Sequence, residues 1–209
     1  CEALRVAKAA GAVTLALTGQ KGSPVEAIVD QTLVVSLTDK EPSPGIRSYQ
    51  ASLVGLFVLA TRLGIISGRL SKKKAQHLLL SLINLVDPLR ATTAALKPLV
   101  RTVAEETARF PMMLFLAAGP HLATARYAAA KRIEASGLCA WAQDFEEAWH
   151  VERFALPRDL PVAIIGPPGL TAREAELAAL NARGLGRRVF TLSAFNEMNI
   201  RPHAHVAFD

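Results

Sequence analysis

The chain contains few cysteine and few aromatic residues. Two cysteines in 209 residues cannot form a disulfide framework, so the composition fits a reducing, cytoplasmic compartment. Aromatic residues make up 6% of the chain, and none alternates with basic residues as a base-stacking surface requires. Thirteen glycines and twelve prolines are too few for a collagen-like or proline-rich protein. With 51% hydrophobic residues, the chain is instead expected to fold around a core.

The sequence also lacks a concentrated stripe of positive charge, although its net charge is +6. The one dense basic run is Lys72-Lys73-Lys74, and the other cations are scattered among acidic residues. We therefore expect a basic surface without a nucleic-acid partner in this segment, nucleic-acid binding being the alternative. An anionic small-molecule substrate would suit the same charge.

A long uninterrupted apolar run is missing as well. The most apolar stretch, Leu53 to Ser67, is interrupted by Arg62 and falls short of the ~20 residues that a membrane span needs. It predicts a buried helix and no membrane. The chain starts at Cys1, within a pattern typical of a helix already under way, and its last residues predict a strand that no further element covers. We therefore expect a fragment.

Short apolar segments alternate with helical patterns in both halves of the chain. The first half predicts helices over 2–10 and 48–66, strands over 13–17 and 31–37, and a short helix that Ser23-Pro24 begins. The second half predicts strands over 112–117, 138–143, 161–166, 189–192 and 205–208. It predicts helices over 123–135 and 146–150 and a further helix that the Thr171 side chain is expected to cap. Between the halves, residues 71–110 predict two helices without a strand.

This order predicts an α/β fold with parallel sheets, because short apolar strands joined by helices are covered on both faces. We expect two three-layer αβα modules of the flavodoxin-like kind, the first one truncated. The predicted boundaries are 1–68 for the first module, 69–108 for a helical connector and 109–209 for the second module.

Three residues of the second half form a candidate catalytic set. Lys131 and Glu134 lie three apart and share a helix face, and His150 ends a short acidic segment. Such side chains can bind an anionic sugar, move a proton and open a ring. Taken singly, each has a plainer interpretation, as a surface ion pair or a loop histidine.

Other reactive residues indicate no site. Cys1 could be an N-terminal nucleophile, but its context favours a chain start created by truncation, and Cys139 lies in an apolar strand and is expected in the core. His203 and His205 lack a third ligand at a known spacing, so we expect no metal. Gly166-Pro167-Pro168-Gly169 could receive an anion at a helix N-terminus, although a tight turn between strand and helix is favoured.

The motifs around the candidate set resemble those of a known family. Residues 119–136 are similar to the glycine turn and Ala-Leu-Lys-x-x-Glu-x-Ser helix of the second sugar-isomerase (SIS) domain in double-SIS proteins. The strand around Cys139–Ala142, the segment Glu147–His150 and the strand Pro161–Ile165 continue the match. The family includes the isomerase half of glucosamine-6-phosphate synthase and the fructosamine-phosphate deglycases.

The first half resembles the same family. Ala9 to Thr18 is similar to its Ala-x-x-x-Gly-Ala stretch, and Ser23-Pro24 followed by Asp30 matches its next helix and strand. Glu41 with Arg47-Ser48-Tyr49 resembles its glutamate loop and Thr-Lys-Ser-Tyr segment. Within that loop, Ser43 and Gly45 are the expected substrate-binding residues.

The resemblance implies an isomerase or deglycase that acts on amino-sugar or fructosamine phosphates. Glu134 would move a proton between C1 and C2, Lys131 would balance charge on oxygen, and His150, supplied by the neighbouring subunit of a homodimer, would help to open the sugar ring. No cofactor is implied.

Departures from the family pattern leave a second interpretation open. Tyr127 replaces an acidic residue, Ile46 stands where threonine is common, and Val151 replaces the glycine after the histidine. The alternative is a non-catalytic, regulatory phosphosugar-binding protein.

Overall fold

The computed structural model describes residues 1–39, 44–155, 157–194 and 204–208, and for residues 194 and 204–208 it describes the backbone alone. The chain divides into two compact units, Cys1–Asp87 and Pro88–Asp209. The division falls in the first turn of a helix, within the region predicted as a connector. The boundaries of the three predicted domains stay predictions.

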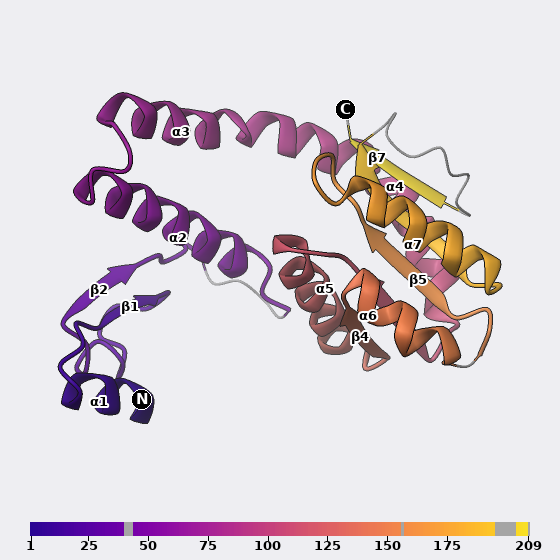
Figure 1. Ribbon diagram of the computed structural model, residues 1–209, viewed down its shortest axis with the longest axis horizontal. Coiled ribbons are helices and arrows are strands. Elements are labelled where there is room, and N and C mark those ends of the chain that lie inside the picture. Colours follow the sequence, from indigo (N-terminus) through magenta and orange to yellow (C-terminus); the bar gives the residue numbers. More distant parts are fainter. Residues whose placement is uncertain (40–43, 156, 195–203, 209) are drawn as a thin grey trace. The chain divides into compact units, whose positions relative to one another are not determined.

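The first unit contains a two-stranded parallel sheet and three helices (Figure 1). Its elements are α1 (Glu2–Ala9), β1 (Leu15–Thr18), β2 (Gln31–Val34), α2 (Arg47–Ile66) and α3 (Lys72–Asn84). Helix α2 approaches the sheet at Gly55: a Cβ atom there would lie 2.5 Å from Val35 Cγ1 and 2.8 Å from Leu17 Cδ1. The missing side chain therefore allows the helix to pack closely on β1 and on Val35, the residue after β2.

Two predictions for the first unit are wrong. Residues 24–30 form turns in place of the short helix expected after Ser23-Pro24, because the hydrogen bonds there do not continue into a helical series. Helix α2 exists where it was predicted, but only Gly55 and Thr61 are buried on it. A sheet of two strands is too narrow to cover a helix of 20 residues.

Two helical stretches meet the length and composition of a membrane span, Arg47–Ile66 and Lys72–Ala108. Length and composition alone are weak evidence for a membrane span. These helices bury few residues, namely Gly55 and Thr61 in the first stretch and Ala75 and Thr107 in the second. The second stretch consists of α3 and α4 (Val86–Ala108), with Pro98 inside α4. Its polar face includes Glu105 and Glu106, so it is not apolar on all sides.

The second unit contains a five-stranded parallel sheet. Its further elements are β3 (Met112–Leu116), α5 (Pro120–Ser136), β4 (Cys139–Gln143), α6 (Phe145–His150), η1 (Glu152–Phe154), β5 (Pro161–Ile165), α7 (Ala172–Gly184), β6 (Arg188–Ala194) and β7 (Ala204–Phe208). The strand order is β4-β3-β5-β6-β7, which is the flavodoxin-like order. The predicted α/β fold with parallel sheets is thereby confirmed.

Side chains that alternate along the strands separate two cores on opposite faces of this sheet. Leu114 and Leu116 belong to a cluster that contains Phe145 of α6 and three alanines of α7. Phe115, between those two leucines, belongs to a second cluster that contains Ala125 of α5. Because neighbouring residues of a strand point to opposite faces, α5 covers one face while α6 and α7 cover the other.

Two side-chain predictions are also wrong in this unit. Cys139 is exposed, because it is the first residue of the edge strand β4. Thr171 precedes α7 but makes no side-chain cap hydrogen bond. The turn after β5 brings α7 close to the strand, and Gly166 allows this approach because a Cβ atom there would collide with Ala175 of α7. The glycine therefore serves close packing of helix on strand.

Candidate functional site

Helix α5 carries Lys131 and Glu134 on a face that is open to solvent. Lys131 Nζ lies 2.6 Å from Glu134 Oε2, and their side chains are 20% and 45% exposed. The pair is thus close enough for a charge-assisted hydrogen bond. The structure brings these two predicted residues together.

Arg132, between the two, turns the other way. Its guanidinium donates to the carbonyl oxygens of Thr107 (3.2 Å) and Phe110 (3.0 Å), just before β3 begins. Burial lowers the pKa of this guanidinium from its usual value. These contacts fix the rotation of the last turns of α5 and so direct Lys131 and Glu134 outward. Sequence reasoning missed this role, since nothing in the pattern distinguishes Arg132 from a surface arginine.

The pair opposes the local electrostatics of its helix. Glu134 lies in the last turn of α5, where the helix dipole disfavours a negative charge. The order of lysine before glutamate is also the less favourable one for such pairs. Both the position of Glu134 and the order of the pair are therefore the less favourable ones for the stability of an isolated helix.

Tyr127 completes the group one turn earlier on the same face. Lys131 Nζ lies 5.1 Å from the centre of the Tyr127 ring, within the range of a cation–π interaction. Sequence analysis noted Tyr127 as a departure from the family pattern and did not place it in the site. The spacing of four residues from Lys131 was the signal that could have included it.

His150 lies on the opposite side of the sheet from this group. It ends α6, where its Nε2 is 3.2 Å from Glu146 Oε1, and its side chain is 64% exposed. Because α5 and α6 cover opposite faces, His150 and Glu134 of one chain do not form one site. The predicted set of three is therefore divided within the chain into a pair and a separate histidine.

The predicted substrate-binding loop is only partly described. Ser43 and Glu41 lie outside the described residues. Gly45 lines a hollow of the first unit together with Ser48 and Ser52 of α2. The other lining residues are Gly19, Val35, Leu37 and Asp39. Backbone and hydroxyl groups that surround such a hollow can hydrogen-bond a polar ligand.

His203 and His205 were considered as metal ligands in the sequence and set aside for want of a third ligand. Within the described ranges, no group of three or more histidine, cysteine or acidic side chains could hold a metal ion. His203 lies outside the described residues, and of His205 only the backbone is described.

The chain is similar in sequence and in fold to known proteins. No known family profile matches the chain. The glutamine–fructose-6-phosphate aminotransferase [isomerizing] of Thermus thermophilus is 28% identical over 199 residues, which are 95% of this chain and 33% of that protein. The chain thus spans a third of the length of this curated relative.

Solved structures share the fold. The C-terminal domain of glucosamine-fructose-6-phosphate aminotransferase from Francisella tularensis superposes with a TM-score of 0.91 at 15% identity, over 100% of this chain and 60% of that one. Glucosamine-6-phosphate deaminase from Thermotoga maritima gives a TM-score of 0.62 at 17% identity, over 94% and 57%. The chain therefore has the fold of the double sugar-isomerase proteins and is similar in sequence to an isomerizing aminotransferase, which confirms the resemblance first seen in its motifs.

Proposed function

We propose that the protein is a sugar-phosphate isomerase or deglycase that acts on amino-sugar or fructosamine phosphates. The observation that carries the proposal is the Lys131–Glu134 pair on the exposed face of α5. The similarity to an isomerizing aminotransferase supports it. A cytoplasmic location agrees with this activity, and the chemistry proposed below uses no cofactor.

In the proposed reaction one carboxylate does the proton transfer. Glu134 takes a proton from one of the carbons C1 and C2 while the carbonyl oxygen or imine nitrogen gains one, which gives an enediol or enolamine. The carbon-bound proton then returns to the other carbon as the hydroxyl on that carbon loses its own proton. Lys131 Nζ, next to this carboxylate, balances the negative charge that develops on the substrate oxygen. The sugar gains and loses no atom overall, so the Lys131–Glu134 pair needs no second reactant for the isomerisation.

The remaining predicted residues take supporting roles in the proposal. His150 transfers a proton when the sugar ring opens, a step in which the ring oxygen gains a proton and the anomeric hydroxyl loses one. A neighbouring copy must supply this histidine, because it lies on the other face of the sheet. Ser43 and Gly45 bind the substrate, and the hollow beside Gly45 is a place where hydroxyl and backbone groups gather.

The test replaces the base by its uncharged isostere. Glu134→Gln should lower kcat about 10²- to 10⁴-fold on a panel of ketose and fructosamine 6-phosphates, because removing a general base has effects of that size. Glu105→Gln is the matched control, since Glu105 is an exposed glutamate of α4. Full activity of Glu134→Gln would exclude the mechanism.

A non-catalytic, regulatory sugar-phosphate-binding protein is the second candidate. The departures at Tyr127 and Val151 favour it, because they alter residues beside the pair and beside His150. Calorimetry with fructose 6-phosphate distinguishes the two candidates. Binding without turnover by the wild-type protein would support the second one.

A further inference from the structure

We propose that Tyr127 is a positioning residue that holds the Lys131 ammonium group at the site while the charge of Glu134 changes. The proposal rests on the function proposed above for the Lys131–Glu134 pair. It concerns how that pair is kept in place, and it assigns a role to Tyr127, which was not among the predicted site residues.

Lys131 has a partner on each side along the helix face. The Tyr127 ring lies four residues before it, with its centre 5.1 Å from Nζ, and the Glu134 carboxylate lies three residues after it, 2.6 Å away. Residues at these spacings lie on the same helix face, so the ammonium is held between a ring and a carboxylate. Its own side chain is only 20% exposed, which limits competition from water.

The two partners respond differently to the proton transfer. When Glu134 accepts a proton, its attraction for Lys131 falls, because the interaction loses its ionic character. The face of an aromatic ring attracts a cation whatever the state of a neighbouring carboxylate. Tyr127 therefore holds Lys131 in place at the stage when the substrate oxygen carries its largest negative charge.

The ring, rather than the hydroxyl group, is the part that this role requires. Tyr127→Phe keeps the aromatic face and should retain kcat within about twofold. Tyr127→Leu keeps an apolar side chain but loses the ring, and should lower kcat about two- to fivefold with a smaller change in KM, as expected from the loss of a partly exposed cation–π interaction. Equal kcat values for Tyr127→Leu and wild type would overturn the proposal.

A double-mutant cycle tests the contact without any need for turnover. Tyr127→Leu is made in the full chain and in a Lys131→Met background, and the folding equilibrium constant is measured by urea unfolding. The substitution should change that constant about two- to fivefold less in the Lys131→Met background, because the cation is then already absent. Equal effects in both backgrounds would overturn the proposal.

The two measurements separate the two proposals. If the wild-type chain turned over none of the sugar phosphates, the proposed isomerase function would fail, and the cycle would still decide whether Tyr127 holds Lys131. Coupling in the cycle together with the kcat loss in Tyr127→Leu and its recovery in Tyr127→Phe would support the positioning role.

Discussion

At the scale of single residues, position on a helix could be predicted from the sequence but contacts between elements could not. The spacing of Lys131 and Glu134 was enough to place both on one face, and the structure adds the distance of 2.6 Å. The inward contacts of Arg132 join α5 to the residues just before β3, so no local pattern predicts them. Cys139 was wrongly placed in the core because its exposure depends on which strand forms the edge.

Asp30 gives a residue-scale prediction about acid stability. Its carboxylate contacts Lys8 Nζ at 2.8 Å and accepts hydrogen bonds from the Thr14 amide and hydroxyl. The hydrogen bond from Lys8, followed by those from Thr14, lowers the pKa of Asp30 from 3.8 to about 2. A lowered pKa means that this stabilisation is present above about pH 4 and is lost as the pH falls toward 2.

We therefore expect Asp30→Asn to reduce the loss of stability between pH 4 and 2. Urea unfolding of wild type and variant at several pH values measures this loss. Glu2→Gln is the control for an exposed carboxylate that accepts a hydrogen bond from Arg5, three residues away. Parallel curves for wild type and Asp30→Asn over this range would contradict the assignment.

At the scale of elements, most helices and strands lie where the alternation of apolar residues predicted them, because periodicity is a local property. The exception after Ser23-Pro24 shows the limit of a cap signal without enough helical residues behind it. The burial of α2 was overestimated for a different reason: an apolar helix is buried only if another layer is wide enough to cover it.

Close packing of α2 on the sheet gives a prediction at this scale. Gly55→Val should lower the free energy of unfolding by about 1–3 kcal/mol, because its side chain would meet Val35 and Leu17 and force the helix away. Ala60→Val, on the exposed side of the same helix, is the control for the cost of a β-branched residue. Equal destabilisation by both substitutions, measured by urea unfolding, would refute this account.

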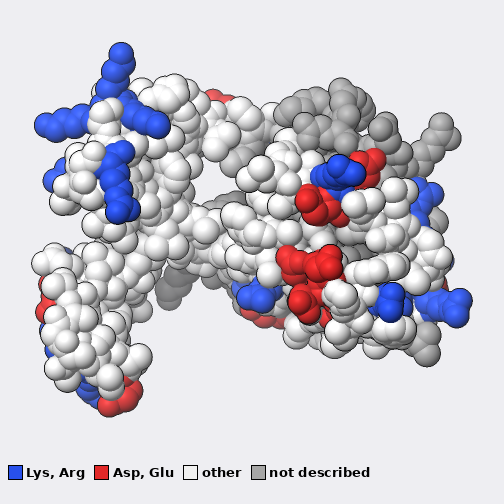
Figure 2. Space-filling model, in the orientation of Figure 1, with Lys and Arg blue, Asp and Glu red and all other residues white. Residues whose placement is uncertain are grey.

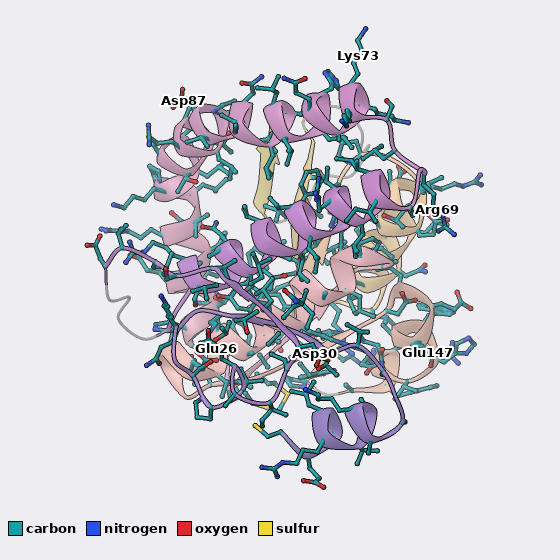
Figure 3. All side chains as sticks on the ribbon, turned by 90° about the vertical axis from the view of Figure 1, so that its left-hand side faces the viewer. Glu26, Asp30, Arg69, Lys73, Asp87 and Glu147 are labelled. Atoms are coloured by element: carbon teal, nitrogen blue, oxygen red, sulfur yellow. The ribbon has the colours of Figure 1, made fainter. Side chains whose placement is uncertain are left out.

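Positive charge gathers on α2, α3 and the turn between them. Between Pro42 and Val86 the sequence has six lysines and arginines and no acidic residue, a local charge equal to the net charge of the chain. Arg69 projects from the turn between α2 and α3, and Lys73 projects from the start of α3 (Figure 3). No acidic side chain lies beside this turn in the view of Figure 2. The excess of positive over negative charge thus lies on one helical hairpin, which corrects the expectation that all cations outside Lys72-Lys73-Lys74 are scattered among acidic residues.

At the scale of the whole molecule, the position of His150 gives the assembly prediction. Since His150 and Glu134 lie on opposite faces of the sheet, a complete site in the proposed enzyme needs two copies. Val151 and Phe154, next to His150, are 61% and 69% exposed and offer apolar surface for such a contact.

Mixing two inactive variants tests this homodimer. Glu134→Gln and His150→Ala proteins should each be inactive and should together regain part of the activity after subunit exchange, because some heterodimers carry one intact site. Analytical ultracentrifugation checks the dimer itself. No recovery after confirmed exchange, or an active monomer, would count against a shared site.

The sequence by itself determined the type and order of most elements, the fold class and the face shared by Lys131 and Glu134, because periodicity and helical spacing act over a few residues. Only the tertiary structure decided the strand order β4-β3-β5-β6-β7, and with it the edge position of Cys139. It also decided that α5 and α6 cover opposite faces. The reason is that the connections from β3 to β4 and from β4 to β5 run in opposite directions across the sheet, and right-handed crossovers then place their helices on opposite sides.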